Sequence, residues 1–121
     1  MSDAAQASAC ATNTTGSPRE LEARALLKAA EQLDDVATNW TGADERLYSA
    51  LLFNGQLWTI FMSAAIDDDN PQPREVRQSI ANIGSFVMKQ TSDMQMNPDV
   101  RKLDALININ RNLAAGLAGQ A

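Results

Sequence analysis

Apolar side chains recur every three or four residues along most of the chain, a pattern typical of amphipathic helices. The first such segment, 18–38, carries charged residues on its opposite face. It opens with Ser-Pro-Arg-Glu at 17–20, a capping box with proline at the first helical position. We therefore expect a helix over 18–38, with an apolar stripe made of Leu26, Ala30, Leu33 and Ala37, leading to Trp40.

Thr41-Gly42 ends that pattern, and a second helix is predicted over 43–66. It has two neighbouring apolar stripes, so we expect it to be the central helix, covered on more than one side. Gly55 lies inside this helix, where glycine is unfavourable by about 1 kcal/mol relative to alanine. A close helix crossing at Gly55 is our hypothesis for its presence. The stripes are Leu47, Leu51, Trp58, Phe61, Met62 and Ala65, and beside them Ala50, Phe53, Leu57, Ile60 and Ala64.

Three aspartates and two prolines at 67–73 end the second helix. Carboxylates oppose the negative end of a helix dipole, so we expect Asp67–Asp69 beyond the last turn, in a solvated loop. A third helix is predicted over 73–92. A fourth is predicted over 98–117, with Asn97-Pro98-Asp99 as its capped start and Gly116 and Gly119 at its end. The expected inward residues of the last two helices are Val76, Ile80, Ile83, Gly84 and Val87, then Val100, Leu103, Leu106, Ile107, Asn110, Leu113, Ala114 and Leu117.

No segment alternates with the period of a strand, so we predict an all-α fold, a compact bundle of about four helices in a single domain over 17–121. Residues 1–16 contain no Leu, Ile, Val, Phe or Trp and are expected to form a disordered tail. They lack the basic start and apolar run of a signal peptide. The apolar stretch 57–66 falls short of the ~20 residues that span a bilayer. We expect a cytoplasmic protein without membrane insertion.

The composition offers little to catalysis. The 121 residues include no histidine and one cysteine, which removes the commonest general base and any multi-thiolate metal site. Cys10 has no basic neighbour to activate it as a nucleophile. Asp67–Asp69 could attract a cation, but the calcium-loop spacing is missing. We therefore expect no enzyme, no catalytic residue, no metal site and no cofactor.

The net charge is −5, and it is unevenly spread. Residues 1–70 hold 11 acids and 4 bases, whereas residues 71–121 hold 4 acids and 6 bases. An acidic chain lacks the basic footprint of a nucleic-acid-binding protein, so direct contact with nucleic acid is not expected. The basic excess of the second half leaves messenger RNA binding open.

Three stretches together resemble the FlaF family of flagellar proteins: Ala-Leu-Leu-Phe-Asn-Gly-Gln-Leu-Trp-Thr at 50–59, Asn-Pro-Gln-Pro-Arg-Glu-Val-Arg at 70–77 and Leu-Ile-Asn-Ile-Asn-Arg-Asn-Leu-Ala-Ala-Gly-Leu at 106–117. The resemblance covers about 18–118. It departs from the family pattern at Gly55 and Gln56, where basic residues are usual, and at Gln72, where we expect leucine. These departures affect the local surface chemistry rather than the family.

The resemblance implies a non-enzymatic role in flagellum biogenesis, with flagellin as a partner and FlbT as a second possible one. The leading hypothesis is an export chaperone that covers an amphipathic flagellin helix in a groove. The alternative is a regulatory adaptor that controls flagellin synthesis together with FlbT.

The candidate partner-binding residues fall into two groups. Trp58, Phe61, Met62 and Met88 are candidates for lining a groove, because aromatic and methionine side chains are common on binding surfaces. Trp58 also has the spacing of a core residue. Met88, Met94 and Met96 cluster around the expected turn between the last two helices, where core packing and partner contact both remain open. Arg77, Asn110 and Arg111 match family motif positions and suit either inter-helix hydrogen bonds or partner contacts.

Overall fold

The computed structural model describes residues 18–119, which form four α-helices and one short 3-10 helix. No described residue is in a strand, and the helices pack together, so the predicted all-α bundle is confirmed. The expected tail at 1–16 and the Ser17 cap lie outside the described residues. The elements are α2 (Pro18–Thr38), α3 (Glu45–Ile66), α4 (Arg74–Met96), η2 (Val100–Lys102) and α5 (Leu103–Gly119).

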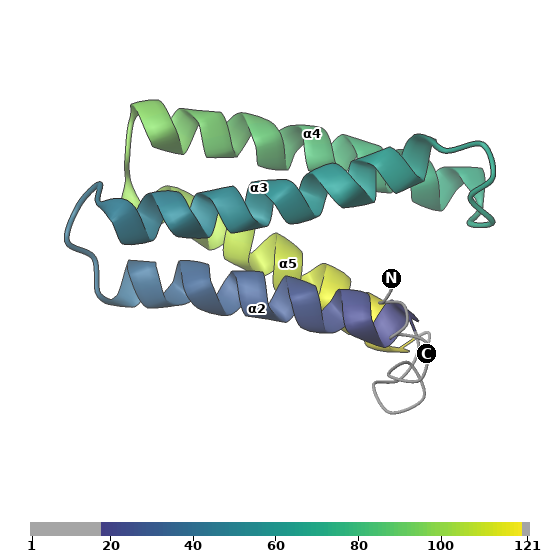
Figure 1. The fold of residues 1–121 in the computed structure, drawn as a ribbon, viewed down its shortest axis with the longest axis horizontal. Helices are drawn as coiled ribbons and strands as arrows, with labels where there is room; N and C mark the ends of the chain where they lie inside the picture. The colour runs from purple at the N-terminus through teal and green to yellow at the C-terminus, as the bar shows by residue number, and fades with distance from the viewer. Residues whose placement is uncertain (1–17, 120–121) are drawn as a thin grey trace, which may run out of the picture.

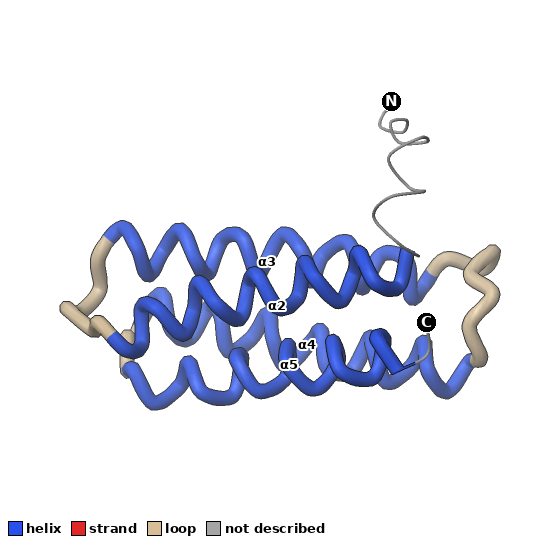
Figure 2. Tube along the Cα trace, turned by 90° about the horizontal axis from the view of Figure 1, so that it is seen from below, coloured by secondary structure: helices blue, strands red, loops and turns tan. Residues whose placement is uncertain are grey.

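The helices run lengthwise, with turns at both ends of the bundle (Figures 1 and 2). The helix α2 packs against both α3 and α5, and α3 packs against α4. The helices α4 and α5 meet where η2 joins them and then diverge toward the opposite end, as Figure 1 shows. That divergence leaves the two helices separated at the end where α2 and α4 begin.

The core is built mainly from leucines around one tryptophan. Trp58 is fully buried, and so are Leu26, Leu33 and Leu51. Burying each leucine stabilises the fold by about 1.5–3 kcal/mol relative to an exposed side chain. The described residues include three buried polar side chains, Asn54, Thr91 and Asn110. The predicted stripes of α2 and α5 thus supply much of this core, with the Asn54 and Asn110 amides among the buried side chains.

Helix starts differ from the predicted ones where an aspartate takes the capping position. The helix α3 begins at Glu45 rather than 43, because Asp44 Oδ1 accepts hydrogen bonds from the backbone N–H groups of Arg46 and Leu47. Asp99 likewise accepts from the N–H of Arg101 and caps η2, so the predicted Asn97 cap is wrong. Aspartate is as good a cap as asparagine, and sequence alone did not separate the two.

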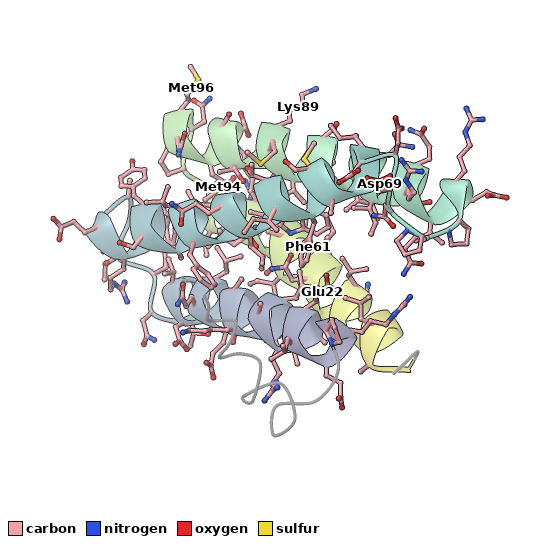
Figure 3. All side chains as sticks on the ribbon, turned by 45° about the vertical axis from the view of Figure 1, so that its right-hand side comes forward. Glu22, Phe61, Asp69, Lys89, Met94 and Met96 are labelled. Carbon is pink, nitrogen blue, oxygen red and sulfur yellow. The ribbon has the colours of Figure 1, made fainter. Side chains whose placement is uncertain are left out.

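The predicted end of the third helix at 92 is also wrong, because α4 continues to Met96. The sequence analysis placed Met94 and Met96 around the expected turn, but Lys102 Nζ lies 2.6 Å from Asp93 Oδ2 and donates to the Asn97 carbonyl. These contacts stabilise the last turn of α4. Both Met94 and Met96 therefore lie on the helix α4. Met94 is fully buried and Met96 is 79% exposed, so they face opposite environments (Figure 3).

The helix α3 is covered on more than one side, as predicted, because it packs against both α2 and α4. The prediction that its second stripe is covered along its whole length is wrong. Ile60 is 64% exposed, and Ala64 is exposed as well. The close crossing expected at Gly55 is also absent, since a Cβ there would meet no atom within 4 Å. The close approach occurs instead at Gly84 of α4, where a Cβ would overlap the Met62 side chain of α3. Gly84 therefore gives α3 and α4 their tight contact.

By length and composition, α3 could cross a membrane, unlike any other helix of 18–119. The sequence analysis judged length from the apolar stretch 57–66 alone, whereas the helix as a whole has 22 residues. Core helices of globular bundles share the same composition, and α3 buries Trp58 and Asn54 against its neighbours. Asp67–Asp69 lie beyond its last residue, as predicted, with the Asp69 N–H donating to Asp67 Oδ1 over 2.9 Å.

Candidate partner-binding groove

A groove of about 700 Å³ opens where α4 and α5 diverge. The first turns of α2 and the last turns of α3 form its remaining sides, so all four helices contribute to it. It is the larger of the two pockets described among residues 18–119. A groove of this size between two helices can accept part of another helix or an apolar ligand.

The two long walls of the groove are apolar. On α4, Val76, Ile80 and Ile83 follow one another at helical spacing, and on α5 Leu113 and Leu117 face them. The pattern predicted these stripes to be inward, which would bring α4 and α5 into contact. Because α5 packs along α2 instead, the two stripes do not close on each other. They remain partly exposed as the sides of the groove.

Phe61 joins the groove to the core. Its ring packs edge-on against Trp58, with centroids 5.6 Å apart and planes at 84°. Such edge-to-face pairs contribute about 0.5–1.5 kcal/mol beyond their buried area. Trp58 is itself fixed in the core, so Phe61 presents a rigid aromatic surface to the groove.

Charged groups of the groove are confined to its open end. Glu22 and Arg19 come from α2 and Glu75 from α4. Partial burial raises the pKa of the Glu22 carboxyl, while the nearby Arg19 charge acts in the opposite direction. Figure 3 shows Glu22 and Phe61 on the side of α2 and α3 that faces α5. The groove is therefore apolar along its length and weakly acidic at one end.

A buried hydrogen-bond network lies beneath the groove. Trp58 Nε1 donates to Asn110 Oδ1 over 3.0 Å, and Asn110 Nδ2 donates to Asn54 Oδ1 over 2.7 Å and to the Leu26 carbonyl over 3.4 Å. The network joins α2, α3 and α5. Buried amides that are paired in this way can fix the register between helices. Inter-helix hydrogen bonding was one of the two roles that the sequence left open for Asn110.

The other candidate binding residues lie away from the groove or beneath it. Met62 packs over Gly84, and Met88 is partly buried against the core. Arg77 Nε donates to the Ala65 carbonyl over 2.7 Å, which satisfies an end carbonyl of α3. Arg111 forms a half-exposed ion pair with Asp34 at 3.7 Å, a geometry of small energetic value. Phe61 is the candidate residue that lines the groove.

The sequence analysis assigned the walls of the groove to the core. One signal was present: residues 78–88 and 112–119 carry no charge, so both helices lack a charged solvent face there. Within residues 18–119, no three carboxylates or thiols come together as metal ligands. The arrangement provides an apolar surface for binding.

Comparison with known proteins adds one finding. A family model described as "Flagellar protein FlaF" matches residues 4–117, which includes nearly the whole described bundle. No curated protein and no solved structure gives a significant match.

Proposed function

The chain belongs to the FlaF family of flagellar proteins, and on that premise we propose that it binds flagellin and supports its secretion as a cytoplasmic export chaperone. The role is non-enzymatic and requires a surface rather than a reactive group. It keeps an aggregation-prone helix of its cargo covered until export.

The groove between α4 and α5 is the observation that supports this proposal. Val76, Ile80 and Ile83 present apolar side chains at the spacing that an amphipathic helix uses for its own apolar face. A helix laid between α4 and α5 would bury both walls and complete the bundle as an additional helix. The groove leaves the polar face of such a helix in water.

The chain's own amino-terminal segment is a poor occupant of the groove. Apart from Met1, residues 1–17 contain only small or polar side chains. Binding in grooves of this kind relies on a few large apolar anchors. A cargo helix with Leu, Ile or Phe anchors fits the groove better.

Titration of the isotope-labelled protein with purified flagellin tests the proposal. We expect amide shifts at Val76, Ile83 and Gly116, with small shifts at Arg111 on the outer side of α5. Saturating flagellin without shifts would contradict flagellin binding. Shifts confined to residues outside the groove would contradict its location.

A deletion strain separates the chaperone from the regulatory adaptor that would act with FlbT. A chaperone predicts less secreted flagellin while translation of its messenger RNA continues. An adaptor predicts changed flagellin translation with export intact. Measuring flagellin translation and secretion in the same cells distinguishes the two roles.

A further inference from the structure

The outer face of α3 is exposed and uncharged. Residues 47–66 contain no Asp, Glu, Lys or Arg, although 25 of the 121 residues are charged. One row at four-residue spacing lies on this face, and all its members are exposed: Tyr48, Leu52, Gln56, Ile60 and Ala64. Leu52 and Ile60 are 61% and 64% exposed.

A solvent-facing helix of a bundle normally carries charges on its outer side. The helix α2 follows that rule, and its exposed charged residues are Glu20, Glu22, Arg24, Lys28, Glu31 and Asp35. The helix α3 has the composition of a helix with a further neighbour. Within 18–119 no such neighbour covers Leu52 or Ile60.

The central part of the exposed row has an aliphatic side chain at the same spacing on each side of its midpoint, Gln56. Leu52 and Ile60 each lie four residues from Gln56, on opposite sides of it. We propose that a second copy of this chain covers the face, with the two α3 helices antiparallel and a twofold axis at Gln56. Leu52 of each copy then contacts Ile60 of the other, and the two Gln56 amides pair with each other. Rows at four-residue spacing are the ridges that interlock in the commonest helix packing.

If two copies associate, charge favours this face over the charged faces of the bundle. Two chains with a net charge of −5 repel each other, and the repulsion is least across a surface without carboxylates. A twofold interface also requires one patch to be complementary to itself, which the row around Gln56 satisfies. The groove is formed by other side chains of the bundle, apart from Ala64 at its edge, so this inference does not depend on flagellin binding.

One helix pair buries less than the ~1,200–2,000 Å² of a standard stable interface, so the dimer is expected to be weak. Sedimentation velocity of the full chain over a range of micromolar concentrations tests it. The average molecular mass should rise from that of one copy toward that of two as the concentration increases. Leu52→Glu should abolish this rise. Leu27→Glu, at a 48%-exposed site of α2, is the matched control and should dimerise like the native chain.

A charge swap tests the antiparallel register. Leu52→Glu combined with Ile60→Lys should restore the dimer, because each introduced carboxylate would face an introduced amine. Leu52→Glu combined with Ile60→Glu should stay monomeric. Circular dichroism confirms that each variant is folded. A native chain that stays monomeric at every concentration, or a dimer that persists in Leu52→Glu, would overturn the proposal.

Discussion

Trp58 Nε1 donates a hydrogen bond to Asn110 Oδ1 across the core, and this contact decides which amide groups of the buried network donate and which accept. An indole N–H can only donate, so the Asn110 oxygen must face it. The Asn110 amide nitrogen then donates to Asn54 Oδ1. Asn54 Nδ2 is consequently buried without a hydrogen-bond partner. The two amides are therefore unequal in their contribution to stability.

Replacing Asn110 should cost more than replacing Asn54. Asn110→Ala leaves the Trp58 N–H and Asn54 Oδ1 unpaired and opens a cavity, with an expected loss of about 3 kcal/mol in unfolding free energy. Asn54→Ala removes an unpaired donor together with one hydrogen bond, so its loss should be smaller. Urea denaturation of both variants measures the difference. Equal losses, or a larger loss for Asn54→Ala, would show that the network is not directed as described.

Alanine should have opposite effects at two glycines of the bundle. At Gly84 a Cβ would lie 2.6 Å from Met62 Sδ, so Gly84→Ala should destabilise the fold by about 1–3 kcal/mol despite the better helix propensity of alanine. At Gly55 a Cβ meets nothing within 4 Å, and Gly55→Ala should stabilise by up to about 1 kcal/mol.

Combining Gly84→Ala with Met62→Ala provides the control for the steric explanation. The double variant should lose less stability than the two single variants together, because the overlap disappears with the methionine side chain. Thermal melts of the two single variants and the double variant measure these losses in stability. Additive losses would rule out the Met62 contact as the cause.

Asp99 should contribute stability that disappears in acid. The Arg101 guanidinium hydrogen bond and the Arg101 backbone N–H hold the pKa of this carboxyl at about 2. In the unfolded chain an aspartate has a pKa of about 3.9. The stabilisation from ionised Asp99 is therefore complete above that pH and is lost as the pH falls toward 2.

Asp99→Asn preserves a good helix cap and removes the charge. The native chain should therefore melt above this variant at neutral pH, and the gap should close as the pH falls through the window between the two pKa values. The measurement is the melting temperature of both proteins against pH. A gap that stays constant into acid would argue against ionisation of Asp99 as its source.

Arg77 lies at a family motif position, and replacing it tests whether such a residue stabilises the fold or binds a partner. Arg77→Ala removes the hydrogen bond to the Ala65 carbonyl and should cost about 1 kcal/mol of stability. Because Arg77 does not line the groove, flagellin affinity should be unchanged at a temperature where the variant is folded. Calorimetric titration and urea denaturation give the two values. A lost affinity without lost stability would place Arg77 in the interface.

The fold was largely predictable from the sequence because helical periodicity depends on residues that are close together in the chain. The stripe through Leu26 and Leu33 and the stripe of α5 through Asn110 predict which faces are buried. The partner of Asn110 was not predictable, since Asn54 is 56 positions away and no one-dimensional pattern pairs two amides. The end of α4 was missed for a similar reason. The Lys102 contact that stabilises it comes from beyond the turn.

The groove was less predictable than the fold. An apolar stripe on α4 indicates that Ile80 and Ile83 are removed from water, but it does not say whether α5 or another molecule covers them. That depends on the angle between α4 and α5, which is set by the packing of α5 on α2. The sequence therefore predicted Phe61 as a groove residue and assigned the walls to the core.

Occupation of the groove by flagellin is the central claim, and Gly116 gives the most direct test of it. This glycine lines the groove, and a Cβ there meets nothing within 4 Å. Gly116→Leu should therefore fill the groove without disturbing the fold, while Gly116→Ala controls for helix propensity. Calorimetric titration with flagellin should show native affinity for Gly116→Ala and at least a tenfold loss, about 1.4 kcal/mol, for Gly116→Leu at unchanged melting temperature. Native affinity in a folded Gly116→Leu variant would contradict the account.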